Sequence, residues 1–318
     1  MSGDALNTQP TMPVTVVGGY LGAGKTTLVN HLLRQANGLR LAILVNDFGD
    51  LPIDADLIEN QDENVISISG GCVCCSFGSD LIGALIDLRN LEPRPDHLLI
   101  EASGVALPGA IAESVSLLQD FKMDSIVVLA DAETVQQRSR EKYFSDTINR
   151  QLTSADLIVL NKCDLPGRDD LSKTETWLRN DFPNAACLCT QRAELPLCLL
   201  TEKDVLGSVI ETRINARTTP FSYHPGYVTS VLEFPKGRDP NAIAAVLAHE
   251  DSGLLRAKGH IEGADGEIYT VQTVGRRSEV RRSPVGVGSV GRVVLIAPDW
   301  HVAPAELADA LGGRVHIR

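Results

Sequence analysis

The sequence predicts an α/β protein in which a mainly parallel sheet flanked by helices is followed by a small α+β domain. Three observations favour this fold. Short apolar runs rich in β-branched residues alternate with helical patterns from Pro13 onward. These runs are apolar throughout, which is typical of parallel strands covered on both faces. A polar, proline-containing stretch at 213–224 precedes a second group of elements. We therefore expect a disordered tail at 1–12 and domains at 13–215 and 222–318.

Strands of the first domain are expected where the apolar runs occur, at Val14–Val17, Leu39–Val45, Val65–Ser69, His97–Ile100, Ser125–Ala130, Asp156–Leu160 and Ala185–Cys189. Helical patterns lie between several of them, at Thr27–Gln35, Leu81–Leu91, Pro108–Leu118, Asp146–Thr153 and Asp169–Arg179. Strands that alternate with helices in this way form βαβ units, and these units build a parallel sheet.

The second domain shows a different order of elements. Strand-like segments are expected at Tyr227–Phe234, Leu255–Glu262, Glu267–Val274 and Arg292–Ile296, and helices at Pro240–Glu250 and Pro304–Leu311. Glycine, arginine and serine are frequent in Gly275–Gly291, which indicates a long hairpin or loop. This mixture predicts a small α+β unit, and we expect it to provide a surface for a client protein or for a homodimer.

Composition and charge exclude several classes of protein. The chain has 318 residues, 43% of them hydrophobic and 22% charged, which is ordinary for a globular protein with a sizeable core. Its net charge of −12 repels nucleic acid and anionic membranes, so neither is an expected partner. The apolar runs are shorter than the ~20 residues of a membrane span, and the first residues lack a signal-peptide pattern. Seven cysteines, three of them within four positions, indicate a metal or thiol cluster in a reducing cytosol, so the expected location is cytoplasmic.

The segment Gly19–Thr26 fits the phosphate-loop pattern G-x-x-x-x-G-K-[ST]. Glycines let several backbone N–H groups point at one phosphate, and the helix beginning at Lys25 adds its positive end. Lys25 is expected to reach the β and γ phosphates, and the Thr26 hydroxyl to coordinate Mg²⁺. The alternative is a glycine turn with an accidental lysine. The sequence therefore predicts a P-loop NTPase domain with nucleotide-binding residues Gly19, Gly22, Ala23, Gly24, Lys25, Thr26 and Thr27.

An N-K-x-D element, Asn161–Asp164, follows a later strand and predicts that the nucleotide is GTP. The Asp164 carboxylate can accept from the ring N–H and from the exocyclic amine of guanine, a donor pair that adenine lacks. Asn161 can support the loop or meet the base, and the stem of Lys162 can lie over the ring. The alternative is an aspartate that caps a helix after the strand.

Glu101 ends the strand at His97–Ile100 and is followed by a glycine at Gly104. An acid at a strand end beside a phosphate loop commonly holds Mg²⁺ through water. Lys25 and Glu101 are therefore the expected catalytic residues, and Gly104 is expected to bring a backbone N–H near the γ-phosphate. Asp131 is a weaker candidate for the same region. The alternative for Glu101 is an ordinary surface residue.

Cys72, Cys74 and Cys75 form a C-x-C-C cluster in a glycine-preceded loop. Thiolates are soft ligands that suit Zn²⁺, Cu⁺, Co²⁺ and Ni²⁺. Three neighbouring thiols cannot easily complete a tetrahedron, and such an exchangeable site suits metal transfer more than structural support. The alternatives are buried structural cysteines or a C-x-x-C redox pair. Strand packing explains Cys187 and Cys189 better than metal binding does.

Together these motifs resemble the CobW-type metallochaperone GTPases, relatives of the nickel-insertion GTPases. The matching segments are Gly19–Leu33, Gly70–Ser76, the E-x-S-G strand end at Glu101–Gly104, the N-K-x-D element and Leu255–His260. The resemblance implies that the cysteine loop binds a metal in a GTP-dependent way and releases it to a client. It assigns Lys25 and Thr26 to phosphate and Mg²⁺, and Asn161 and Asp164 to guanine.

One departure from the family concerns an acidic loop. Many relatives carry E-N-E-F-G-E, whereas this chain has V-N-D-F-G-D from Val45 to Asp50. Val45 replaces a glutamate that could bind metal, while Asp47 and Asp50 keep the charge on shorter side chains. Asp47 is the expected additional metal ligand. The histidine-rich linker of some relatives is missing, so metal storage is not expected.

The leading hypothesis is a GTP-hydrolysing carrier of zinc or cobalt that delivers its metal to a client protein. Mg²⁺ and GTP would order the loop 46–54, which connects the phosphate site to the cysteines. One alternative is a P-loop NTPase or kinase that acts on a small molecule and has structural cysteines. The other is a protein that uses GTP to regulate a partner.

Overall fold

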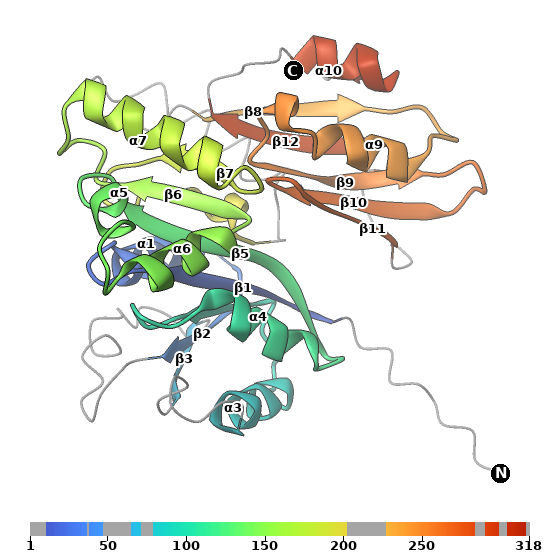
Figure 1. The fold of residues 1–318 in the computed structure, drawn as a ribbon. Helices are drawn as coiled ribbons and strands as arrows, with labels where there is room; N and C mark the ends of the chain where they lie inside the picture. The colour runs from blue at the N-terminus through green and yellow to red at the C-terminus, as the bar shows by residue number, and fades with distance from the viewer. Residues whose placement is uncertain are drawn as a thin grey trace.

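The computed structural model describes residues 11–36, 38–46, 65–70, 79–201, 227–283, 290–298 and 304–315 (Figure 1). In this part of the chain, the first sheet has seven strands in the order β3-β2-β4-β1-β5-β6-β7, and every neighbouring pair is parallel. The strands are β1 (Met12–Gly19), β2 (Leu41–Asn46), β3 (Val65–Gly70), β4 (His97–Glu101), β5 (Phe121–Asp131), β6 (Leu157–Asn161) and β7 (Ala186–Cys189). The predicted parallel α/β fold is confirmed.

Helices cover both faces of this sheet: α1 (Lys25–Gln35), α3 (Ser79–Arg89), α4 (Pro108–Ser116), α5 (Val135–Arg138), α6 (Ser145–Thr153) and α7 (Arg168–Asp181). Val16 and Val17 are adjacent and fully buried, yet they belong to different core clusters. Val17 packs in the cluster that contains Leu28 of α1, whereas Val16 packs in the cluster that contains Leu85 of α3. Because successive strand residues face opposite sides, a strand buried on both sides must be apolar at each position.

The second sheet is antiparallel, apart from one isolated parallel bridge, and has the order β11-β10-β9-β12-β8-β13. Its strands are β8 (Tyr227–Glu233), β9 (Arg256–Glu262), β10 (Ile268–Val274), β11 (Arg277–Arg282), β12 (Arg292–Pro298) and β13 (Arg314–Val315). Helices α9 (Pro240–Leu247) and α10 (Pro304–Leu311) contribute Ile243 and Leu307 to its core. The expected hairpin after residue 274 is present, because β11 pairs with β10.

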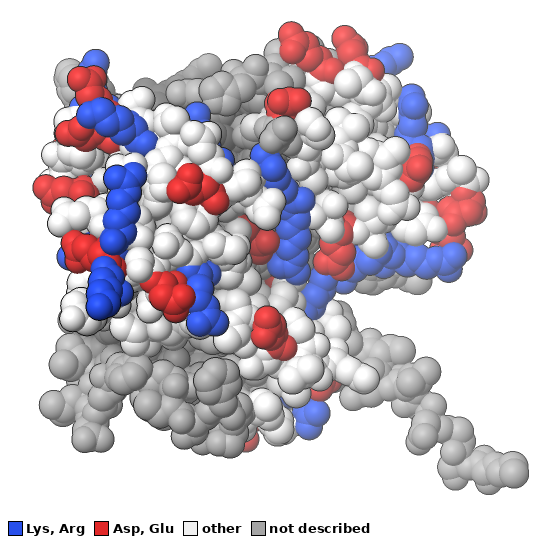
Figure 2. Space-filling model, viewed as in Figure 1, with Lys and Arg blue, Asp and Glu red and all other residues white. Residues whose placement is uncertain are grey.

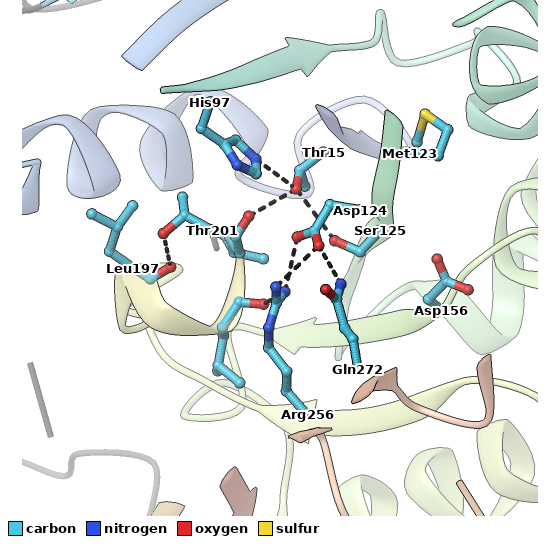
Figure 3. Close-up of polar contacts among 12 residues, drawn as sticks. Thr15, His97, Met123, Asp124, Ser125, Asp156, Leu197, Thr201, Arg256 and Gln272 are labelled. Carbon is cyan, nitrogen blue, oxygen red and sulfur yellow. Dashed lines mark hydrogen bonds and ion pairs between the residues drawn. The ribbon is translucent and has the colours of Figure 1, made fainter. Parts of the chain in front are cut away.

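A buried polar junction joins the two sheets (Figure 3). The guanidinium of Arg256 donates to both carboxylate oxygens of Asp124 over 3.0 Å and to the carbonyl of Leu199 over 3.1 Å. At its rim, Arg277 contacts Asp156 over 3.2 Å. Val274 and Ile296 of the second sheet also pack in the core cluster of α1. The expected linker at 213–224 lies outside the described residues.

On the face drawn in Figure 2, acidic and basic side chains of the described residues are interspersed, so the net negative charge is not gathered in one patch there. Among the described residues, no helix has the length and apolar character needed to cross a membrane.

Candidate functional site

The expected nucleotide-binding residues meet at one edge of the parallel sheet. β1, β4, β5 and β6 end at Gly19, Glu101, Asp131 and Asn161. Val17 is paired with Glu101, and Asp131 is paired with Asn161. The carboxyl ends of parallel strands lie at the same edge, where open α/β sheets bind their ligands. The arrangement therefore places the phosphate loop beside the acid and the N-K-x-D element.

The phosphate loop depends on glycine at two of its positions. Gly19 and Gly24 have φ angles of +134° and +105°, which L side chains rarely adopt. A Cβ at Gly19 would also lie 2.3 Å from the carbonyl oxygen of Leu129, and one at Gly24 would lie 2.5 Å from the amide nitrogen of Asn161. α1 begins at Lys25, and no described side chain caps it at Gly24. The N–H groups of its first turn are thus positioned for an anion.

Lys25 and Thr26 lie where the motif requires them. The Lys25 side chain is buried, and its ammonium group donates to the carbonyl of Gly19 over 3.0 Å. The Thr26 hydroxyl donates to a carboxylate oxygen of Glu101 over 2.8 Å. Glu101 is only 2% exposed, so it is not an ordinary surface residue. A hydroxyl and a carboxylate in contact are hard oxygen ligands of the kind that Mg²⁺ prefers, so this pair fits a Mg²⁺ ion.

Gly104 brings the loop after β4 against the phosphate loop. A Cβ at Gly104 would lie 2.4 Å from the side chain of Leu21 and 2.9 Å from its backbone nitrogen. The side-chain amide of Gln151 donates to the carbonyl of Gly104 over 3.1 Å and holds this loop from the α6 side. Glycine is therefore required here by the close approach of two loops, and its backbone lies next to the expected phosphate site.

Asn161 connects the phosphate loop to a second loop. Its amide nitrogen donates to the carbonyl of Ala23 over 2.9 Å, and its amide oxygen accepts from the backbone N–H of Ala193 over 2.8 Å. Asn161 is 2% exposed. In this structure it therefore has the first of its two expected roles, the support of the loop.

The N-K-x-D element has a strained backbone. Lys162 has a φ of +62°, and the nearby Arg192 and Ala193 have φ of +52° and +54°. Non-glycine residues rarely adopt these angles, and they cluster at functional sites. Sequence reasoning missed Arg192 and Ala193, because nothing in their residue types signals a left-handed backbone.

Lys162 and Asp131 form an ion pair of 2.7 Å. The carboxylate of Asp131 is therefore engaged with the N-K-x-D element, whereas Glu101 contacts Thr26. Asp164 is exposed at the end of this element. It does not cap the following helix, because α7 begins after Gly167 and has no side-chain cap among the described residues.

The expected metal ligands Cys72, Cys74, Cys75 and Asp47 lie outside the described residues. The strands that lead to them are described: β2 ends at Asn46 and β3 at Gly70, and these two residues are paired in register. Both strands therefore end at the sheet edge that carries the phosphate loop. Elsewhere in the described ranges, no group of three or more His, Cys, Asp or Glu residues could hold a metal ion.

A cavity of about 640 Å³ lies beside the phosphate loop. Tyr20 and Gly22 of that loop line it together with Arg138 and Phe144. The guanidinium of Arg138 lies 5.5 Å from the ring centre of Tyr20, and the rings of Tyr20 and Phe144 are 5.6 Å apart. These contacts hold the outer side of the loop against α5 and α6.

Comparison with known proteins agrees with this site. The family model described as CobW/HypB/UreG, nucleotide-binding domain, matches residues 13–188. The chain is 29% identical over 314 residues to a protein named zinc chaperone CobW from Sinorhizobium sp, covering 85% of this chain and 87% of that protein. It is 31% identical to the zinc-regulated GTPase metalloprotein activator 1 of Dictyostelium discoideum, covering 68% of this chain and about half, 51%, of the relative.

A solved structure of the zinc-bound YjiA GTPase from E. coli matches 95% of this chain and 99% of that one, with 23% identity and a TM-score of 0.44. The family model covers more than half of the chain, and it spans the phosphate loop, the Thr26–Glu101 pair and the N-K-x-D element. The chain therefore belongs to the CobW/HypB/UreG family, the CobW-type metallochaperone GTPases that its motifs resemble.

Proposed function

We propose that this protein hydrolyses GTP to GDP and phosphate and uses the nucleotide cycle to bind zinc and pass it to a client protein. The observation that carries the proposal is the common edge of the parallel sheet. The phosphate loop after β1, Glu101 at the end of β4, and the strands that lead to Asp47 and to the cysteines all end there.

The chain's own residues bind and orient the triphosphate. Backbone N–H groups of the phosphate loop and of the first turn of α1 hold the phosphate oxygens, and Lys25 exchanges its contact with Gly19 for the β and γ phosphates. Thr26 and Glu101 would hold Mg²⁺, which supplies charge neutralisation on the phosphates when bound. Glu101, buried against Thr26, keeps this hydroxyl oriented toward the phosphate side.

Asp164 reads guanine, with Asn161 and Lys162 in support. Asn161 fixes the loop by its two hydrogen bonds to the backbone, and the Lys162–Asp131 ion pair fixes the side chain two residues before Asp164. A carboxylate held at this position accepts hydrogen bonds from the ring N–H and the exocyclic amine of guanine. Adenine has no such pair of donors and is not bound in this way.

The cysteine loop is the proposed metal-binding site. Cys72, Cys74 and Cys75 follow β3, which lies three strand positions from β1 in the sheet. At about 4.8 Å between strands, the loop leaves the sheet roughly 14 Å from the strand that carries the phosphate loop. The segment after β2 begins between β3 and β1 in the sheet and carries Asp47. A conformational change at the phosphates can therefore reach the thiolates through this one segment.

Zinc is the favoured cargo because the relatives named above are zinc chaperones and zinc-regulated GTPases. Cobalt is the second candidate, because thiolates also suit it. By linkage, the factor by which GTP strengthens metal binding equals the factor by which metal strengthens GTP binding. The client would take the metal from the GDP state, in which the grip of the thiolates is weaker. A homodimer is a further proposal, with the second domain as a docking surface.

Metal affinity in two nucleotide states tests this proposal. Zn²⁺ and Co²⁺ affinities are measured by competition with a chromophoric chelator, in the presence of a slowly hydrolysed GTP analogue or of GDP. We expect at least tenfold tighter binding with the analogue, and loss of this binding in a Cys72→Ser, Cys74→Ser, Cys75→Ser variant. A Cys198→Ser variant, changed in the buried core, is the matched control. Equal affinities in the two states would remove the gating step and leave GTP hydrolysis standing.

The same variants distinguish the proposed function from two alternatives. If the protein is an NTPase or kinase with structural cysteines, the triple serine variant keeps its turnover with and without metal. If it is a GTP-dependent regulator, a client is retained in a nucleotide-dependent way that zinc does not affect.

A further inference from the structure

Two cysteines, Cys163 and Cys189, lie beside the N-K-x-D element, at the carboxyl ends of the neighbouring strands β6 and β7. The backbone N–H of Cys163 donates to the carbonyl of Thr190 over 3.1 Å and so holds the loop after β6 against the residue that follows Cys189. The Cys163 thiol donates to the carbonyl of Leu160 over 3.0 Å, and the Cys189 thiol donates to the carboxylate of Glu175 over 2.7 Å. Both cysteines are half-buried and are not in a disulfide.

The two sulfur atoms differ in acidity. The neighbouring Cys189 side chain lowers the pKa of Cys163, although burial acts in the opposite direction. The neighbouring Cys163, together with burial and the contact with Glu175, raises the pKa of Cys189. Cys187, two residues earlier on β7, is set apart because burial raises its pKa to about 12. Since the thiolate is the reactive form, Cys163 is the nucleophile of this group.

We propose that Cys163 and Cys189 form a reversible disulfide by exchange with a low-molecular-weight disulfide, which makes this pair a redox modification site next to Asp164. The proposal uses three features of the structure. The two cysteines lie side by side, because Leu160, whose carbonyl accepts from the Cys163 thiol, is paired in register with Cys189. They belong to two separate elements that a bond would link, and the carboxylate of Glu175 accepts from the Cys189 thiol, which must lose its proton second. The C-x-C-C cysteines take no part in it.

The exchange proceeds in two balanced steps. The Cys163 thiolate attacks one sulfur of the small disulfide and releases one thiolate, which takes up the proton that Cys163 lost. Cys189 then gives its proton to Glu175 and attacks the sulfur of Cys163, releasing the second thiolate, which receives that proton. Two cysteine thiols are oxidised to one disulfide, and the small disulfide is reduced to two thiols.

The bond would disturb guanine recognition, and this consequence rests on the proposed function. The two sulfur atoms must approach to about 2.05 Å in a disulfide. The loop has little freedom to follow, because Lys162 already has a φ of +62° and its ammonium is paired with Asp131. The displacement therefore reaches Asp164, the next residue after Cys163. Oxidation is expected to weaken guanine nucleotide binding, and bound nucleotide to slow the oxidation.

Peptide mapping of the full chain tests the disulfide. The protein is treated with oxidised glutathione, blocked with an alkylating reagent and digested with trypsin. The expected product joins the peptide Cys163–Arg168 to the peptide Asn180–Arg192. A Cys187→Ser variant gives the same product with Cys189 as the only cysteine in the second peptide. Dithiothreitol is expected to reverse the bond.

Nucleotide affinity is measured on the same samples with fluorescent GDP. We expect at least tenfold weaker binding after oxidation, recovery with dithiothreitol, and no response to oxidised glutathione in a Cys163→Ser variant, which lacks the attacking thiol. Absence of the cross-linked peptide, or pairing of Cys163 with a cysteine other than Cys189, overturns the proposal. A cross-link that leaves GDP affinity unchanged overturns its effect on the site. If the proposed function is wrong, the reduced protein does not bind GDP. In that case the yield of the cross-linked peptide still shows whether the disulfide forms.

Discussion

The carboxylate of Asp124 accepts two hydrogen bonds from the guanidinium of Arg256, each 3.0 Å long, and thereby joins the parallel sheet to the antiparallel sheet (Figure 3). Both side chains are fully buried, at 0% and 1% exposure, and Gln272 donates to the same carboxylate. Asp124 lies seven residues before Asp131 on β5, which is roughly 23 Å along the strand from the nucleotide edge. Changes at this junction should therefore affect stability more than nucleotide affinity.

Replacing Arg256 by alanine is expected to reduce the free energy of unfolding by about 3–5 kcal/mol, because it leaves a buried carboxylate without its ionic partner. Urea unfolding checks this value. The double variant Asp124→Ala, Arg256→Ala should lose less than the sum of the two single variants, since it leaves no lone charge. The control is Arg89→Ala, whose half-exposed pair with Asp120 should contribute about 0–1 kcal/mol. A loss as small as that of Arg89→Ala would contradict a coupled buried pair.

Stability should also depend on pH through Asp124. Burial alone would raise the pKa of this carboxyl, but the charge of Arg256, with His97 and Lys258 nearby, lowers it from 3.8 to about 2. Because the folded pKa is the lower one, the stabilisation is complete above pH 3.8 and is lost as the pH falls toward 2. The total is about 2 kcal/mol, of which about 1 kcal/mol is lost by pH 3.

Urea unfolding at pH 5 and pH 3 measures this loss, and Asp124→Asn is the variant without the titrating group. The fall in stability between the two pH values should be about 1 kcal/mol smaller in the variant. Equal falls in the two proteins would show that Asp124 does not titrate differently on folding.

The sequence was sufficient to predict the parallel sheet and the start of the helix after the phosphate-loop motif, because both follow from local patterns. Continuous apolar runs indicated buried parallel strands, and the motif fixed the start of α1 at Lys25, as observed. The contact between Thr26 and Glu101 also follows, since acids at the ends of parallel strands meet the loop at the same edge.

Other features depend on long-range contacts that leave no local pattern. Asp124 and Arg256 are 132 residues apart, and neither lies in a motif that pairs them. The left-handed angles of Arg192 and Ala193 also carry no composition signal, because glycine is absent there. Asn161 had two expected roles, and only the positions of Ala23 and Ala193 show that it supports the loops.

The Gly24→Ala substitution should weaken GTP binding at least tenfold. It forces an L side chain into a φ of +105° and places a methyl group 2.5 Å from the amide nitrogen of Asn161. The phosphate loop must shift to accept it. The matched control is Gly38→Ala, which has a similar left-handed φ of +70° but open space around the added carbon. Both variants should lose about 1 kcal/mol of stability from strain, and only Gly24→Ala should lose nucleotide affinity.

The Thr26→Val substitution should reduce the rate of GTP hydrolysis at least a hundredfold. Valine has the shape of threonine but removes the hydroxyl that contacts Glu101 and would coordinate Mg²⁺. Thr26→Ser, which keeps the hydroxyl, should retain most of the activity. Phosphate release is measured at increasing Mg²⁺ concentration, and nucleotide binding is measured separately. Hydrolysis by the valine variant at the native rate would exclude this hydroxyl from the reaction.

The Asp164→Asn substitution should change the base that the protein accepts. Guanine offers two donors, a ring N–H and an amine, and a carboxylate accepts both; xanthine has a carbonyl in place of the amine. An asparagine amide offers one acceptor and one donor, so it matches xanthine and leaves a donor of guanine facing a donor. We expect GDP affinity to fall at least a hundredfold and xanthosine diphosphate affinity to rise. Asp169→Asn, at an exposed carboxylate in the first turn of α7, is the matched control and should bind GDP as the native protein does. Unchanged base preference in the Asp164 variant would place guanine recognition elsewhere in the site.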